Sequence, residues 1–330
     1  MSSTESDSSN SPSEGSSALV IGASGFIGGH LAKALLESGY RVTAYSRASS
    51  PQKPGSEECA IRWLTGELGD ADSLLRACMG VDVVFHLANI AHVGEPDRAL
   101  LQGVNVRGTE SVCRASVAAS VPRLIYFSSV LAKDPSASPY AESKRDAEAA
   151  VLSAGNESAG KLHVTVLRPA NTYGPHMKGN LAAFIKRISR GRIPPLPRLR
   201  NRIALVSVTD LCRIAIAAAE GGQKSGEIYT LTDGEEYTPS RIEAAVYHAL
   251  GRQKPNWATP LVIFYIAAMV AQLASWFGLG RNNLGLRTFR NLVKDEPVNV
   301  EGFVRELGVK PSHTLESTLP EILRSIEVIE

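Results

Sequence analysis

Cysteine is scarce in this chain, and neither sign of charge dominates. The 330 residues include four cysteines, and no two of them have the Cys-x-x-Cys spacing of zinc sites and redox motifs. This argues against a disulfide framework or a metal site and favours buried thiols in a reducing compartment. The formal net charge is +2 and no long basic run occurs, so the sequence predicts no nucleic-acid partner.

The N-terminal segment contains few apolar side chains. Residues 1–17, "MSSTESDSSNSPSEGSS", are rich in serine and acidic residues. They cannot bury enough apolar surface to offset the entropy lost on ordering, so we expect a disordered tail without chemistry. The segment also lacks the basic and apolar regions of a secretion signal, which favours a cytoplasmic protein.

The following residues alternate short apolar runs with helical periodicity. Hydrophobic residues make up 44% of the chain, which is typical of a globular protein with an ample core. The predicted strands are 18–22, 41–46, 81–88, 123–128 and 163–168, and the predicted helices are 26–38, 73–79, 104–120 and 140–154. This alternation predicts an α/β protein with a Rossmann-type, doubly wound parallel sheet.

Three glycines stand where the first strand gives way to a helix. Gly22, Gly25 and Gly28 follow an apolar run and open an amphipathic segment. Glycine is needed where φ is positive and where a phosphate group must approach the main chain. The start of the helix then offers free N–H groups to a pyrophosphate. This context predicts a dinucleotide site.

The composition changes after Pro169. Proline and arginine crowd residues 190–202, "RGRIPPLPRLRNR", which cannot form a regular helix. A strand and helix follow in "IALVSVTDLCRIAIAAAE", another strand in "GEIYTLTD", and the rest is mainly helical. We therefore expect a dinucleotide-binding domain formed by 18–172 and about 203–232. A smaller, mostly helical C-terminal lobe, formed by 173–202 and 233–330, is expected to bind the substrate.

A tyrosine and a lysine lie four residues apart at the start of a predicted helix. Tyr140 and Lys144 therefore project from one face. A free tyrosine has a pKa of ~10, and a neighbouring ammonium, together with the positive ring of a bound cofactor, is expected to lower the pKa of Tyr140 toward neutrality. Ser129 ends the preceding strand at the carboxyl edge of the sheet, where ligands bind in such folds. These residues predict acid–base chemistry.

The glycine turn, "FHLA", "SSV", "YAESK" and "LRP" together resemble the extended branch of the short-chain dehydrogenase/reductase superfamily, the NAD-dependent epimerase/dehydratase family. The resemblance implies hydride transfer, with Tyr140 as acid/base and Ser129 as hydrogen-bond donor to the reacting oxygen. It implies that Lys144 holds the nicotinamide ribose, that Asn105 supports the site and that Glu67, where the family usually has Asp, contacts the adenine amine. The implied cofactor-binding residues are Gly22, Ser24, Gly25, Phe26, Ile27, Gly28, Arg47, Glu67, Leu68, Leu87, Ala88, Asn105, Tyr140, Lys144 and Pro169.

The second strand ends in Ser46 and Arg47, with no carboxylate to hold both ribose hydroxyls. An arginine at this point can pair with a 2′-phosphate, so Arg47 favours NADP over NAD. A solvated loop cation is the alternative interpretation.

The substrate class is indicated by resemblance alone. "HLANIAHVGEPDRALLQGVNVRGT" and "LRPANTYGP" look most like nucleotide-sugar 4-epimerases and 4-keto reductases, of the UDP-hexosamine type found in polysaccharide synthesis. The implied substrate-binding residues are Asn89, His92, Ser129, Asn171 and Arg202. One departure is that Ile203 stands where the nearest relatives have a second arginine. The absence of that arginine removes a charge-assisted hydrogen-bonded pair with a diphosphate, worth ~1.5–3 kcal/mol.

Residues 255–280 contain no charged side chain, which leaves alternatives open. A helix over 260–277 would be ~27 Å long, short of a ~30 Å hydrocarbon core. It is therefore interpreted as a buried helix, an apolar lid or a peripheral membrane contact. The last two interpretations fit a membrane-associated, 3β-hydroxysteroid-like or other lipid-alcohol dehydrogenase. A non-catalytic dinucleotide-binding subunit and a homodimer also stay open.

Overall fold

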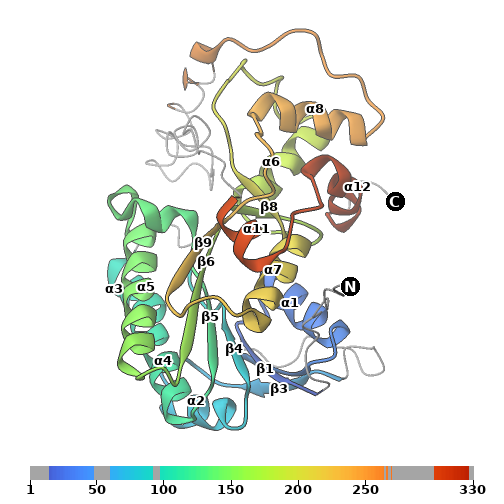
Figure 1. Cartoon of the computed structure of the whole chain (residues 1–330). Coiled ribbons are helices and arrows are strands. Elements are labelled where there is room, and N and C mark those ends of the chain that lie inside the picture. The colour runs from blue at the N-terminus through green and yellow to red at the C-terminus, as the bar shows by residue number, and fades with distance from the viewer. Residues whose placement is uncertain are drawn as a thin grey trace, which may run out of the picture. The chain divides into compact units, whose positions relative to one another are not determined.

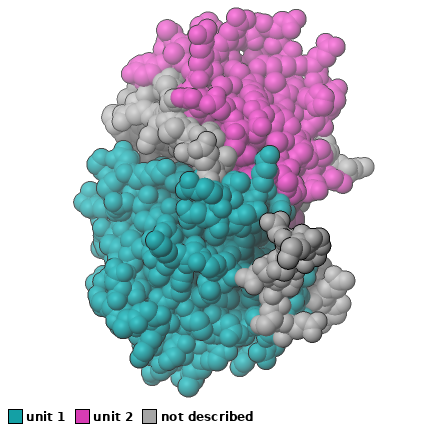
Figure 2. Space-filling model, viewed as in Figure 1, with its two compact units in different colours: residues 1–169, 208–231, 301–310 teal, residues 170–207, 232–300, 311–330 magenta. Residues whose placement is uncertain are grey.

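The computed structural model describes residues 15–47, 60–91, 97–263, 265–266, 269 and 301–326. Two compact units are distinguished in Figure 2. Unit 1 comprises Met1–Pro169, Val208–Leu231 and Glu301–Lys310, and unit 2 comprises Ala170–Ser207, Thr232–Val300 and Pro311–Glu330.

Unit 1 is built on a seven-stranded sheet in the order β3-β2-β1-β4-β5-β6-β9, with every neighbouring pair parallel (Figure 1). Its strands are β1 (Ser17–Ile21), β2 (Arg41–Ser46), β3 (Arg62–Thr65), β4 (Val83–His86), β5 (Arg123–Phe127), β6 (His163–Pro169) and β9 (Glu227–Leu231). At the centre, Ile21 of β1 pairs with Tyr45 on one side and with His86 on the other. This order is that of a doubly wound nucleotide-binding sheet, so the predicted fold class is confirmed.

The central strands are mostly apolar, as expected for a parallel sheet with helices on both faces. Leu19, Val20 and Ile21 have no exposed surface. In one layer α4 contacts both α2 and α5, and in the other α1 contacts α7 (Figure 1). The helices of this unit are α1 (Phe26–Glu37), α2 (Ala71–Cys78), α3 (Arg98–Leu101), α4 (Gly108–Ala118), α5 (Pro139–Glu157), α7 (Val208–Glu220) and α11 (Glu301–Leu307).

Three local expectations for unit 1 need correction. Ser17 belongs to β1 rather than to a tail, because Asp82 accepts hydrogen bonds from its backbone N and its Oγ, both at 2.7 Å. The expected helix 104–120 begins as a π-helical turn, Gln102–Arg107, before α4. Strand β3 was not predicted, since it has only four residues and both of its ends are exposed.

Unit 2 contains a two-stranded parallel sheet, β7 (Asn171–Tyr173) with β8 (Leu205–Ser207). The expected strand in "IALVSVTDLC" is thus present as β8, but it pairs with β7 and does not join the large sheet. The helices are α6 (Asn180–Ser189), α8 (Pro239–Ala249) and α12 (Leu315–Ser325), and α8 contacts both of the others. The Thr314 and Ser317 side chains form a capping box at the start of α12.

The charge-free stretch is described only in part. Residues 261–263, 265, 266 and 269 are helical and Pro260 precedes the helix, whereas the rest of the predicted 260–277 helix lies outside the described residues. Within the part of the chain that the structure describes, no helix combines the length and the hydropathy needed to cross a membrane.

Cys78, Cys113 and Cys212 are free and buried, and burial raises the pKa of the Cys78 thiol to about 11.

Candidate active site

The parallel sheet brings the predicted cofactor residues of unit 1 to one edge. Most lie at or just beyond the carboxyl end of a strand or in the first turn of the helix that follows it, and Asn105 and Lys144 lie further along the helical segments. Gly22 follows β1, Arg47 follows β2, and Glu67 and Leu68 follow β3. Leu87 and Ala88 follow β4, Ser129 follows β5, and Pro169 ends β6.

The glycine turn has no room for side chains. Gly22 has φ +97°, and a Cβ on it would lie 2.7 Å from the backbone N of Ala88. A Cβ on Gly28 would lie 2.3 Å from the carbonyl oxygen of Gly22. No side chain caps the start of α1 at Gly25, and no acidic residue occupies its first turn. A bare main chain and uncapped N–H groups fit the pyrophosphate of a dinucleotide.

The strand ends next to this turn are tied together by the main chain. The backbone N–H groups of Leu87 and Ala88 both donate to the carbonyl oxygen of Ile21, each at 2.9 Å. Ser24 is exposed, whereas Phe26 and Ile27 are half-buried in the first turn of α1. These contacts hold the end of β4 against the glycine turn.

On the second and third strands, the predicted ribose and adenine residues face solvent. The Arg47 and Glu67 side chains are exposed. The Glu67 carbonyl oxygen accepts a hydrogen bond from the Tyr45 hydroxyl at 3.0 Å, which positions this loop. Leu68 packs against α4 at Gly108, where a Cβ would lie 2.7 Å from Leu68 Cδ1.

Helix α5 carries the predicted acid–base pair. Ser138 caps the helix by accepting a hydrogen bond from the backbone N of Ala141 at 3.1 Å. Lys144 is fully buried, and its Nζ donates to the carbonyl oxygen of Phe127 at 2.6 Å. The same Nζ lies 4.6 Å from the centre of the Tyr126 ring. Ser129, two residues beyond Phe127, is half-buried and its Oγ accepts a hydrogen bond from the backbone N of Leu131.

The pKa values of this pair differ from the sequence expectation. Burial raises the pKa of Tyr140 to about 12 instead of lowering it, because the phenolate loses contact with water. Burial also lowers the pKa of Lys144 to about 7, and the negative charge of Glu148 opposes that shift. The Lys144 ammonium donates to the Phe127 carbonyl, so the expected stabilisation of a Tyr140 phenolate is not found in this structure.

Asn105 lies in the π-helical turn and is buried. Its Nδ2 donates to Ser143 Oγ at 3.0 Å and to the Ile90 carbonyl oxygen at 3.1 Å, and its Oδ1 accepts from the Ile90 backbone N at 2.8 Å. Ser143 Oγ in turn donates to the Tyr140 carbonyl oxygen at 2.9 Å. Asn105 therefore connects the loop after β4 with the turn of α5 that carries Tyr140.

Two buried features were missed by the sequence reasoning. One is the pair of Glu148 on α5 with Arg168 on β6, whose only sequence signal is that Glu148 lies one helical turn beyond Lys144. The other is His86 at the end of β4, whose Nε2 lies 2.9 Å from Thr109 Oγ1. Burial lowers the pKa of His86 to about 3, and the nearby Lys144 acts in the same direction.

The predicted substrate residues are not all placed. Asn89 is exposed, and its Nδ2 donates to the Leu87 carbonyl oxygen at 2.9 Å. His92 lies outside the described residues. In unit 2, Asn171 is exposed at the start of β7, and Arg202 Nη1 lies 3.0 Å from Glu236 Oε1. Glu236 therefore balances the charge of Arg202.

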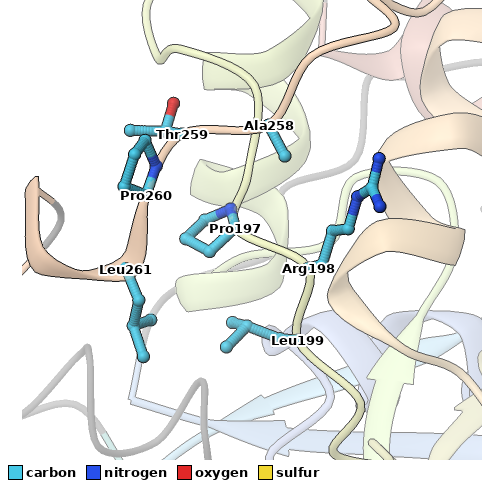
Figure 3. Close-up of a pocket in the computed structure, with 7 residues that line it drawn as sticks. All are labelled: Pro197, Arg198, Leu199, Ala258, Thr259, Pro260 and Leu261. Atoms are coloured by element: carbon cyan, nitrogen blue, oxygen red, sulfur yellow. The ribbon is translucent and has the colours of Figure 1, made fainter.

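Unit 2 also contains a cavity of about 340 Å³ beside the proline- and arginine-rich loop. Figure 3 shows Pro197 and Leu199 on one side of it and Pro260 and Leu261 on the other. The helical residues that follow expose large apolar side chains, among them Val262 at 66% and Ile266 at 51%. No cluster of His, Cys, Asp and Glu suited to a metal ion occurs among the residues described.

Comparison with known proteins finds relatives and solved structures that are similar to this chain over most of its length. A family model described as "NAD dependent epimerase/dehydratase family" matches residues 18–231. A ceramide reductase of Caulobacter vibrioides is 31% identical over 274 residues, covering 79% of this chain and 81% of that protein. A UDP-glucose 4-epimerase of Vibrio cholerae is 24% identical over 269 residues, covering 75% and 79%. The solved structure of MoeE5 in complex with UDP-glucose and NAD superposes with a TM-score of 0.73 at 22% identity, covering 94% of this chain and 98% of that chain.

Proposed function

Because the chain belongs to the NAD dependent epimerase/dehydratase family, we propose that it catalyses hydride transfer between a nicotinamide dinucleotide and a secondary alcohol or ketone carbon. One observation carries this proposal. Tyr140 and Lys144 share a face of α5, and Lys144 is anchored to Phe127 at the strand end that leads into Ser129. That strand end lies on the same edge of the sheet as the glycine turn.

Each of these side chains has a separate task in the proposal. Tyr140 Oη exchanges the proton of the substrate hydroxyl, and Ser129 Oγ donates a hydrogen bond to the reacting oxygen. Lys144 holds the nicotinamide ribose, and its charge together with that of an oxidised nicotinamide ring would stabilise the phenolate. The dinucleotide supplies or accepts the hydride when it is bound. Since burial raises the pKa of Tyr140 to about 12 and Lys144 does not offset this rise, the acid–base role needs the additional charge of that ring.

The cofactor is proposed to be NADP. Arg47 is exposed at the end of β2, where its guanidinium can pair with a 2′-phosphate. MoeE5, by contrast, binds NAD.

The first proposed substrate class is a nucleotide sugar, reduced or epimerised at C4 as in polysaccharide synthesis. The Vibrio cholerae relative and MoeE5 act on or bind UDP-glucose. In unit 2, the exposed Asn171 would hydrogen-bond the diphosphate. Arg202 would have to exchange Glu236 for that diphosphate, because Ile203 cannot supply a second cation.

A lipid alcohol is the second candidate class, and one structural feature favours it. The side chains of Trp257, Leu261, Val262, Ile263, Tyr265, Ile266 and Met269 are large, apolar and 39–66% exposed. Such a run suits an apolar substrate or a peripheral contact with a membrane surface. The Caulobacter vibrioides relative acts on a ceramide.

The two classes are separated by saturation-transfer NMR of the purified protein with UDP and, separately, with ceramide in detergent. Transfer to UDP is expected, whereas transfer to ceramide alone would reject the nucleotide-sugar assignment. An absorption spectrum then shows whether nicotinamide stays bound through purification, as an epimerase requires and a reductase does not. Tyr140→Phe should abolish turnover with cofactor affinity unchanged, and full activity in this variant would refute the proton-transfer role.

A further inference from the structure

Glu148 is the most deeply buried acidic group near the proposed active site. It lies on α5 one turn beyond Lys144 and is 1% exposed. Its Oε1 accepts hydrogen bonds from Ser128 Oγ and from Arg168 Nε, the latter at 2.8 Å. Its Oε2 accepts from Arg168 Nη2 at 2.5 Å. Nη1 of a second, half-exposed arginine, Arg145, lies 3.8 Å from Glu148 Oε2.

These bonds connect three elements of unit 1. Ser128 follows β5, Arg168 belongs to β6, and Glu148 belongs to α5. Lys144 makes a second connection between α5 and β5 through the Phe127 carbonyl oxygen. Helix α5 is thus fastened at two consecutive residues, Phe127 and Ser128, and the next residue is Ser129.

Burying the Glu148–Arg168 ion pair costs free energy that a purely structural contact would not require. Two charges removed from water lose hydration energy that their mutual attraction often fails to recover, and an apolar pair of the same volume commonly serves stability equally well. What the ion pair adds is direction, because the two parallel N–H bonds of a guanidinium hold a carboxylate in one orientation. The remaining lone pair of Oε1 is then aimed at the Ser128 hydroxyl.

We propose that Glu148 is a positioning residue for hydride transfer, and that it holds the Ser129 hydroxyl in register with Tyr140 and Lys144 through Ser128 and Arg168. This inference rests on the proposed function for the role of those three side chains. It assigns Glu148 no contact with substrate or cofactor. The proposal predicts that kcat depends on Glu148, whereas the affinity for the cofactor does not.

The test compares Glu148→Gln with the double variant Glu148→Gln/Arg168→Met in the full chain. The single variant leaves Arg168 buried without its carboxylate, so its unfolding midpoint should fall. The double variant removes both charges and should recover most of that midpoint. If Glu148 positions Ser129, kcat stays at least tenfold below wild type in the double variant, while the Kd for NADPH changes by less than twofold. Recovery of kcat together with the midpoint would overturn the proposal.

Two further variants sharpen the comparison. Ser128→Ala removes only one hydrogen bond and should lower kcat with little change in the unfolding midpoint, and an unchanged kcat would contradict the proposed path to Ser129. Glu157→Gln makes the same chemical change at an exposed position of α5 and should behave as wild type.

A readout without turnover keeps this inference separate from the proposed function. The Lys144 ammonium interacts with His86, the Tyr126 ring and Glu148, and Glu148 supplies the negative charge among them. NMR titration of 13C-labelled lysine, assigned with Lys144→Met, should show a lower pKa for Lys144 in the double variant than in wild type. That shift without any turnover on alcohols or ketones would reject the hydride-transfer function and retain the positioning contact. An unshifted Lys144 would reject the contact itself.

Discussion

Replacing Gly28 by alanine tests the close approach on which the proposed dinucleotide site depends. The added Cβ would lie 2.3 Å from the Gly22 carbonyl oxygen and 2.9 Å from Ala23 Cα. Both are main-chain atoms, so relief requires the turn and α1 to move apart. Overpacking of this kind costs about 1–3 kcal/mol. The moved turn would also misplace the N–H groups offered to the pyrophosphate, and we expect the Kd for the dinucleotide to rise at least tenfold.

Gly29→Ala is the matched control. Gly29 is exposed, in the same helical turn, and a Cβ there would meet its nearest neighbour, the Ala23 carbonyl oxygen, at 3.6 Å. Alanine should stabilise the helix by about 0.5–1 kcal/mol. Urea unfolding and titration of dinucleotide fluorescence measure both effects. Equal damage from both substitutions, or wild-type binding by Gly28→Ala, would refute the close-approach argument.

Three other predictions follow from single residues. An unfolded histidine gains its proton near pH 6.5, whereas burial lowers the pKa of His86 to about 3, so stability should fall by on the order of 5 kcal/mol as pH drops through that window. In His86→Gln this part of the acid dependence, followed by urea unfolding, should vanish. Arg47→Ala should weaken NADPH binding at least fivefold with NADH binding unchanged. Equal losses of affinity for both cofactors, measured by calorimetry, would contradict the proposed contact with the 2′-phosphate. Ser138→Ala should lower the unfolding free energy by ~1 kcal/mol through loss of the α5 N-cap, and an unchanged urea midpoint would show that this cap contributes nothing.

The elements that the sequence predicted well are those with strong local signals. Strand β1, the glycine turn and α1 follow from an apolar run, three glycines and a helical stripe, and all lie within about twenty residues. The same holds for Tyr140 and Lys144 on α5, since four-residue spacing places two side chains on one helical face. Strand β3 was missed because four residues at a sheet edge alternate too weakly to be seen.

The direction of side chains could not be predicted in the same way. A neighbouring lysine was expected to lower the pKa of Tyr140, but Lys144 donates to the Phe127 carbonyl oxygen and the pKa rises. The resemblance places Arg202 among the substrate-binding residues, and in the structure its guanidinium pairs with Glu236. Both outcomes depend on partners between 17 and 34 residues away along the chain.

The order of apolar runs and glycines along this chain was enough to determine a doubly wound parallel sheet and the position of its glycine turn, because periodicity and backbone freedom are local properties. Only the tertiary structure decided that Glu148 meets Arg168 and Ser128, that β8 pairs with β7 outside the large sheet, and that burial lowers the pKa of His86. Those outcomes depend on which groups, distant in the sequence, are buried together away from water. Burial then determines which of the titratable groups are charged.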